Sequence, residues 1–188
     1  MPTADGLTPG LLLAMPQLED PNFHRSVVLL CRHGDDGALG FIVNRPLEIP
    51  ASELLELESE DVGDLPLTVW EGGPVNQERG WLLCRDEPAE GETLNVCDGI
   101  FMSSSQSHLT SVLGGDPRHC EPDRARLLLG YAGWGPGQLD TELAASAWLT
   151  VPVSMDLIFH TPSEKVWESA IRSLGVEPSA ISPGPGIH

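Results

Sequence analysis

Residues 127–139 read Leu-Leu-Leu-Gly-Tyr-Ala-Gly-Trp-Gly-Pro-Gly-Gln-Leu, and the rest of the chain can be interpreted outward from them. The apolar run before Gly130 has the length of a buried strand. After Gln138, apolar residues recur at every fourth position from Leu139 to Ala147, which is the spacing of one helix face. None of these side chains is a strong acid, base or nucleophile. The stretch therefore predicts a strand, a glycine-rich turn and a helix.

The remaining chain alternates short apolar runs with turn signals. Asp-Gly at the end of 34–37 is typical of a tight hairpin, because glycine readily takes the positive φ that such a turn needs. The run 163–175 is the clearest helix, with its apolar residues on one face and Gly175 at its end. Helices are predicted at four places: 50–57, 103–113, 138–147 and 163–175. Many short strands with four helices between them predict an α+β fold with a mostly antiparallel sheet.

Length and composition favour one domain. The chain has 188 residues, of which 40% are hydrophobic, enough for a substantial core. No internal repeat or composition change divides it, so we predict a single domain over 1–188. The tails 1–9 and 179–188 are expected to be loose, because they are rich in proline, glycine and small residues.

The charge balance is strongly acidic. The chain has 28 Asp and Glu residues and only 10 Lys and Arg residues, which gives a net charge of −18. This negative charge would repel a phosphate backbone, and the arginines are too scattered to form a basic face that offsets it. Non-specific nucleic-acid binding is therefore not expected. Four separated cysteines without a Cys-x-x-Cys pair are typical of reduced thiols. The apolar run 11–15 is too short for a signal peptide or a membrane span, which predicts a cytoplasmic protein that does not enter a membrane.

The glycine-rich turn has two interpretations. Amides before a helix can bind an anion. However, Gln138 stands where a dinucleotide fingerprint needs its third glycine, and Pro136 lacks an amide donor. The favoured interpretation is a tight structural connection in which Trp134 packs and Gln138 satisfies backbone groups. An anion site involving Trp134, Gly135 and Gln138 stays open as the alternative.

Two arginines at strand or turn boundaries are candidate binding residues. Arg25 and Arg45 could converge on one small acidic ligand, or each could pair with an internal carboxylate, which is the commoner outcome in so acidic a chain. Ser26 could hydrogen-bond beside them. As a nucleophile Ser26 has no support, because no Gly-x-Ser-x-Gly surrounds it.

Other polar clusters are weaker candidates. Serines 103–105 near His108 are explained by helix capping. The run 119–121, His-Cys-Glu, offers metal ligands, but adjacent side chains seldom face one ion and no second pair follows at zinc spacing. His24 and His33 flank a strand and are expected to be loop histidines. We therefore predict no catalytic residue, no metal site and no cofactor.

Four motifs carry a family resemblance: Asp20-Pro21-x-Phe23-x-Arg25-Ser26-Val27-Val28, Gly37-Ala38-x-Gly40-x-x-x-Asn44-Arg45-Pro46, Gly72-Gly73-Pro74-Val75 and residues 130–139. Together they resemble the AlgH/YqgE family of small bacterial proteins, over about 10–178. The resemblance implies a bifurcated, mostly antiparallel sheet curled into a pseudo-barrel and flanked by helices. Members are largely uncharacterised, and some carry a transcriptional-regulator label. Relatives commonly have a His where this chain has Cys84, and an Asn where this chain has Ser146.

These observations favour a non-enzymatic binding or regulatory protein with an unidentified protein or small-molecule partner. The alternatives are a carboxylate- or metal-dependent hydrolase or phosphotransfer enzyme, and a direct DNA-binding transcriptional regulator. The predicted binding residues are turn formers, arginines and an aromatic side chain: Arg25, Ser26, Asn44, Arg45, Gly72, Gly73, Trp134, Gly135 and Gln138.

Overall fold

The computed structural model describes residues 8–18, 20–50, 67–86, 93–104 and 121–181. Its described residues form two compact units. Residues up to Asn44 and from Ala132 onward make the first unit, and Arg45–Tyr131 makes the second. The single domain predicted from the sequence stays a prediction. The two units are described in turn.

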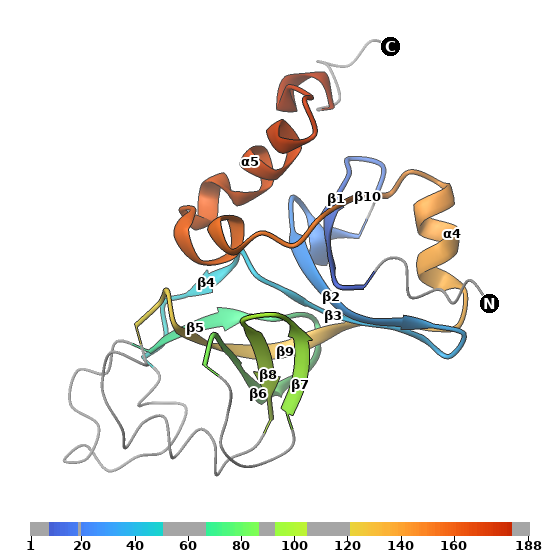
Figure 1. Cartoon of the computed structure of the whole chain (residues 1–188). Coiled ribbons are helices and arrows are strands. Elements are labelled where there is room, and N and C mark those ends of the chain that lie inside the picture. Colours follow the sequence, from blue (N-terminus) through green and yellow to red (C-terminus); the bar gives the residue numbers. More distant parts are fainter. Residues whose placement is uncertain (1–7, 19, 51–66, 87–92, 105–120, 182–188) are drawn as a thin grey trace, which may run out of the picture. The chain divides into compact units, whose positions relative to one another are not determined.

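The first unit is built on antiparallel strands (Figure 1). Their order is β10–β1–β2–β3–β9, of which β9 contributes only its last residues. The strands are β1 (Gly10–Ala14), β2 (Val27–Gly34), β3 (Gly37–Ile42), β9 (Ala125–Trp134) and β10 (Trp148–Val151). The predicted hairpin at 34–37 is confirmed, since Gly34 pairs with Gly37 between β2 and β3.

Two α-helices accompany these strands: α4 (Gln138–Ala144) and α5 (Val166–Ser173). Shorter helical turns are η2 (Pro21–Phe23), η4 (Asp156–His160, a π-turn), η5 (Ser163–Lys165) and η6 (Pro178–Ala180). The helix predicted over 163–175 is thus a 3-10 turn followed by α5. The last two residues of η6, Ser179 and Ala180, fall within the predicted loose tail 179–188, which stays a prediction.

The core of the first unit is apolar on both faces of the strands. One cluster joins alternate residues of β1, β2 and β3 to Trp134, Leu139 of α4 and Trp148. Several residues that alternate with these along the same strands, among them Leu29 and Phe41, are also fully buried. A strand buried on both faces has no polar alternation, which is why β1 and β2 read as continuous apolar runs.

The second unit contains β4 (Pro46–Leu47), β5 (Thr68–Glu71), β6 (Val75–Cys84), β7 (Thr93–Cys97), β8 (Ile100–Ser103) and β9 up to Tyr131. The order β9–β6–β8–β7 is antiparallel throughout. Strand β5 pairs parallel with β9 and antiparallel with β4. The sheet therefore branches at β9. Leu67, Val69, Leu82, Cys84, Ala125 and Leu127 form the core of this unit.

The α+β class with a mostly antiparallel, bifurcated sheet is confirmed. Among the described strands the pairing path runs from β10 to β7 without closing. The predicted helices at 50–57 and 103–113 fall largely on 51–66 and 105–120, outside the described residues. Ser103 itself belongs to β8 and pairs with Leu82, so a helix does not begin there.

Candidate functional site

Arg25 ends a short turn that leads into β2. The carboxylate of Asp20 accepts the amide of Asn22 at 2.9 Å and begins η2. The amide of Ser26 then donates to the carbonyl of Phe23 at 2.9 Å. Between them, Arg25 has a φ of 51°. This left-handed conformation costs a residue with a Cβ about 1–2 kcal/mol, so the turn keeps Arg25 in a strained backbone.

Asn44 braces that strained turn. Its Nδ2 donates to the carbonyl of Arg25 at 3.0 Å, and its Oδ1 accepts the amide of Val27 at 2.9 Å. One side chain thereby satisfies backbone groups on both sides of Ser26. The structure thus brings together three of the predicted site residues, Arg25, Ser26 and Asn44, and assigns Asn44 a structural part in fixing Arg25.

The guanidinium of Arg25 lies over an aromatic ring of α5. Its Cζ is 4.9 Å from the ring centroid of Trp167, within the range of a cation–π contact. Trp167 is buried, and its indole N–H donates to the carbonyl of Ala14 in β1 at 2.9 Å. Arg25 is therefore placed against a rigid surface.

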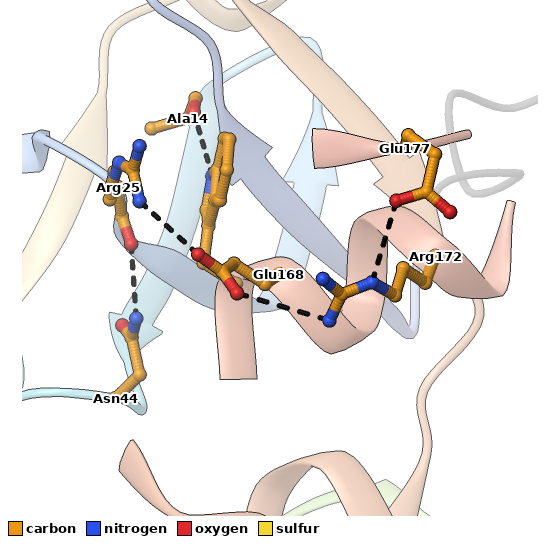
Figure 2. Close-up of polar contacts among 7 residues, drawn as sticks. Ala14, Arg25, Asn44, Glu168, Arg172 and Glu177 are labelled. Atoms are coloured by element: carbon orange, nitrogen blue, oxygen red, sulfur yellow. Dashed lines mark hydrogen bonds and ion pairs between the residues drawn. The ribbon is translucent and has the colours of Figure 1, made fainter. Parts of the chain in front are cut away.

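A chain of alternating charges continues from Arg25 along α5 (Figure 2). Glu168 Oε1 lies 3.6 Å from Arg25 Nη1, while its Oε2 lies 3.8 Å from Arg172 Nη1. Arg172 Nε in turn lies 3.9 Å from Glu177. All of these side chains are at least one third exposed, so each pair is a weak surface ion pair.

Ser26 is fully buried, and its hydroxyl has no hydrogen-bond partner among the described residues. A hydroxyl that becomes a nucleophile needs a base within hydrogen-bond reach. The described contacts of Ser26 give it no such base. The backbone of Ser26, by contrast, makes hydrogen bonds, since its carbonyl accepts the amide of Ala14 at 3.0 Å.

The glycine-rich turn is held by side chains of α4. Gln138 Oε1 accepts the amide of Gly135 at 3.0 Å, which confirms that Gln138 satisfies the backbone of the turn. Its Nε2 donates to Glu142 Oε1 at 3.2 Å. Gly137 precedes the helix with a φ of 75° and gives it no side-chain cap. These contacts favour the structural interpretation of the turn.

Glu142 is the residue whose role the sequence did not reveal. Its Oε2 accepts the indole N–H of Trp134 at 2.9 Å and that of Trp148 at 2.8 Å. One carboxylate thus fixes two buried tryptophans. The signal in the sequence was weak, since only the spacing of four from Gln138 to Glu142 suggests a contact.

Phe23 joins the turn that carries Arg25 to this tryptophan pair. Its ring stacks on Trp134 at 6.3 Å between centroids and meets Trp148 edge-on at 5.5 Å. Trp134 and Trp148 lie 5.8 Å apart. We call Phe23, Trp134 and Trp148 the aromatic cluster. Two groups of predicted site residues within the first unit are therefore linked through it.

The other predicted site residues lie in the second unit. Arg45 pairs with Glu71, with 3.7 Å between Nη1 and Oε2. The expectation that Arg25 and Arg45 each pair with an internal carboxylate is therefore confirmed. A Cβ on Gly72 would lie in hard contact with the carbonyl oxygen of Gly130, and one on Gly130 with that of Gly73. The absence of a Cβ at Gly72 and at Gly130 allows the two backbones to approach closely.

The second unit also holds two groups with shifted pKa values. The guanidinium of Arg126 is buried 4.2 Å from the ring centroid of Trp70, and burial lowers its pKa to about 10, while Asp123 acts the other way. Burial raises the pKa of the Cys84 thiol to about 12, and the carboxylate of Asp86 adds to the shift. Neither pKa shift was predicted from the sequence, because burial decides both.

Within the described residues, no group of three or more His, Cys, Asp or Glu is placed to hold a metal ion. Of the cluster 119–121, His119 and Cys120 lie outside the described ranges, as does His108. His33 is buried with its Nε2 3.0 Å from Asp140 Oδ1, so the expectation of a loop histidine is wrong for it.

Across the same ranges, no helix is long and apolar enough to cross a membrane.

Comparisons with known proteins cover nearly the whole chain. The model of the family described as AlgH-like (DUF179) matches residues 11–179. A UPF0301 protein from Ruegeria pomeroyi is 40% identical over 184 residues, which are 96% of this chain and 98% of the relative. A UPF0301 protein from Vibrio cholerae is 36% identical over 96% of this chain and 98% of its own length.

Solved structures agree. The solution structure of the AlgH protein from Pseudomonas aeruginosa matches with a TM-score of 0.76 at 33% identity, covering 100% of this chain and 98% of that one. A crystal structure of protein DIP2367 from Corynebacterium diphtheriae has a TM-score of 0.66 at 22% identity, which is a likeness of fold alone, over 98% of this chain and 92% of that one. The chain belongs to the AlgH-like family.

Proposed function

We propose that this chain is a cytoplasmic binding or regulatory protein without a catalytic centre, and that its recognition surface is centred on Arg25. The observation that carries the proposal is the φ of 51° at Arg25, a non-glycine residue in a left-handed backbone. Such strain persists where neighbouring groups enforce it, and it is often found at functional sites. Here Asn44 enforces it through two hydrogen bonds.

The contacts around Arg25 support recognition. A strained backbone braced by Asn44 and an aromatic surface supplied by Trp167 hold the guanidinium in one place at the protein surface. A cation that is already positioned loses little entropy when it binds a partner. The thiols of Cys84 and Cys97, which form no disulfide within the described part of the chain, support a reducing compartment.

The test compares Arg25→Asn with wild type. Asparagine tolerates the left-handed backbone, so this variant removes the guanidinium and keeps the turn. Arg32→Gln is the matched control, because Arg32 is an exposed arginine on β2 of the same unit. We expect proteins or metabolites that co-purify with wild type from cells expressing it natively to be lost only from Arg25→Asn. Equal recovery from all three chains, with equal melting temperatures, would contradict the proposal.

The enzyme and DNA-binding alternatives stay predictions, and no contact within the described ranges specifically favours either. A thermal-shift panel with Mg²⁺, Mn²⁺ and Zn²⁺ addresses the metal-dependent enzyme, since a bound metal raises the melting temperature. Retardation of a DNA duplex at low salt addresses the regulator.

A further inference from the structure

We propose that Arg25 is a receptor for a carboxylate group, and that Glu168 occupies the place of that carboxylate until a ligand displaces it. The inference rests on the proposed function and names the ligand chemistry of the same surface. It follows from the donors that Arg25 leaves unused, from the way its guanidinium is fixed, and from the weakness of its pair with Glu168.

The guanidinium of Arg25 has N–H donors that make no hydrogen bond to a described residue. A guanidinium carries five N–H donors in one plane. Among the described residues this guanidinium contacts the ring of Trp167 at 4.9 Å and Glu168 Oε1 at 3.6 Å, and the second distance is beyond hydrogen-bond length. The side chain is 49% exposed. Its donors are therefore available to a ligand from solvent.

The guanidinium is also fixed in a suitable way. The Cζ of Arg25 lies over the ring of Trp167, and a guanidinium that stacks on an aromatic ring keeps the N–H donors of its edge for hydrogen bonds in its own plane. Two parallel N–H donors on that edge match the two oxygens of a carboxylate. Trp167 is itself anchored to the carbonyl of Ala14, and Asn44 anchors the backbone of Arg25. Ring and cation are thus both held before a ligand arrives.

Glu168 is a carboxylate already placed at this cation, and it can be displaced easily. Its pair with Arg25 is long and partly exposed, so it contributes little. Its other oxygen already lies 3.8 Å from Arg172 (Figure 2). If a ligand takes Arg25, Glu168 keeps a cationic partner. Displacement therefore leaves no charge without a partner on this surface.

The net charge of −18 favours a carboxylate over a phosphate. The field of an acidic protein repels every anion, and it repels a doubly charged phosphate more than a single carboxylate. Binding must then come from short-range contacts of good geometry, which the planar pair of guanidinium and carboxylate provides. Either a small carboxylic acid or an acidic peptide segment could supply the group.

The experiment follows two N–H signals by NMR, those of Arg25 Nε and Trp167 Nε1, in the full chain. The probes are acetate, a blocked peptide with a single Glu, and inorganic phosphate, all at equal ionic strength. We expect saturable shifts of both signals with a carboxylate probe, and weak or absent shifts with phosphate. Stronger binding of acetate points to a small acid, and stronger binding of the peptide points to an acidic segment.

Three variants separate the parts of the mechanism. Glu168→Gln removes the competing carboxylate and should tighten binding by up to about fivefold, the size expected of one exposed ion pair. Arg25→Lys loses the planar pair of donors and should weaken binding by about tenfold. Arg25→Asn should abolish the shifts of Trp167, while Arg32→Gln should leave them unchanged.

Two outcomes would overturn the inference: no saturable shift with either carboxylate probe, or phosphate binding as tightly as the carboxylates. Looser binding in Glu168→Gln would also overturn it, because Glu168 would then assist the ligand. These results differ from a failure of the proposed function. Co-purifying partners could still depend on Arg25 while carboxylate probes do not bind, and then only the ligand class would be wrong.

Discussion

The carboxylate of Glu142 accepts the indole N–H of Trp134 at 2.9 Å, and this contact joins α4 to the end of β9. The same oxygen accepts the indole of Trp148 at 2.8 Å. Both tryptophans are buried, so their N–H donors have no water to replace a lost acceptor. Glu142 is therefore the polar centre of the aromatic cluster.

Glu142→Ala should lower the free energy of unfolding by at least about 2 kcal/mol, because two buried donors lose a charged acceptor. Glu142→Gln keeps one acceptor oxygen and should cost less. Urea unfolding followed by tryptophan fluorescence measures both. Glu164→Ala is the control, because Glu164 is exposed in η5 and should be neutral. Equal midpoints for Glu142→Ala and Glu164→Ala would show that this contact does not stabilise the fold.

Gly37→Ala should disrupt the edge where β3 meets β9. Gly37 has a φ of 125°, and a Cβ there would lie in hard contact with the carbonyl oxygen of Trp134. We expect a loss of more than about 2 kcal/mol, as for other substitutions that combine a clash with backbone strain. Gly34→Ala is the matched control in the same hairpin, because a Cβ on Gly34 meets nothing within 4 Å. Thermal unfolding of the two variants would contradict this account if their midpoints fell equally.

Ser146→Gly should stabilise the chain. Helix α4 ends in a Schellman motif, in which the amide of Ser146 donates to the carbonyl of Leu143 and that of Ala147 to the carbonyl of Glu142. Ser146 has a φ of 58° there, which glycine adopts without strain. We expect a gain of about 0.5–1 kcal/mol. Ala145→Gly, at a φ of −83°, should destabilise instead, and differential scanning calorimetry distinguishes the two signs.

Cys84 should resist alkylation in the folded chain. Burial raises its pKa from 9.0 to about 12, so only about a thousandth of it is thiolate at pH 9. Iodoacetamide labelling at pH 9, read by mass spectrometry, should modify Cys84 only after unfolding in urea. Rapid labelling of Cys84 in the native chain would be inconsistent with the burial described.

The same shift gives a pH dependence of stability with a definite sign. Because the folded thiol holds its proton more tightly than the unfolded thiol, its stabilising contribution is complete below pH 9 and is lost as the pH rises towards about 12. Cys84→Ala removes this part of the slope. Unfolding midpoints of wild type and variant between pH 8 and 11 measure the difference.

Local features were predictable from the sequence. The strand, turn and helix of 127–139 follow from apolar spacing and glycine, and the hairpin at 34–37 follows from its turn residues. Of the apolar residues that the spacing places on one face of the helix predicted at 163–175, Val166, Trp167, Ala170 and Ile171 are buried. Leu174 lies on the same predicted face but is 41% exposed, because the helix ends at Ser173.

Features that depend on distant contacts were not predictable. Arg25 has the backbone conformation of a glycine, and only its bracing by Asn44 explains how an arginine keeps it. The contact of Arg25 with Trp167 joins opposite ends of the sequence. Helix α4 also ends at Ala144, earlier than its apolar spacing predicts, because the Schellman motif turns the chain into β10. Spacing within one segment carries no information on such pairs.

The stacking of Phe23 on Trp134 has a consequence for anyone who screens this protein by mutation. Phe23 lies two residues before Arg25, and its carbonyl accepts the amide of Ser26 that closes the turn. A substitution of Trp134 would therefore let this turn shift and lower ligand binding, although Trp134 is buried and the ligand would not reach it. A screen scored only by affinity would rank Trp134 beside Arg25. A genuine contact residue is recognised instead when binding is lost while the indole signals of Trp134 and Trp148 stay where they were.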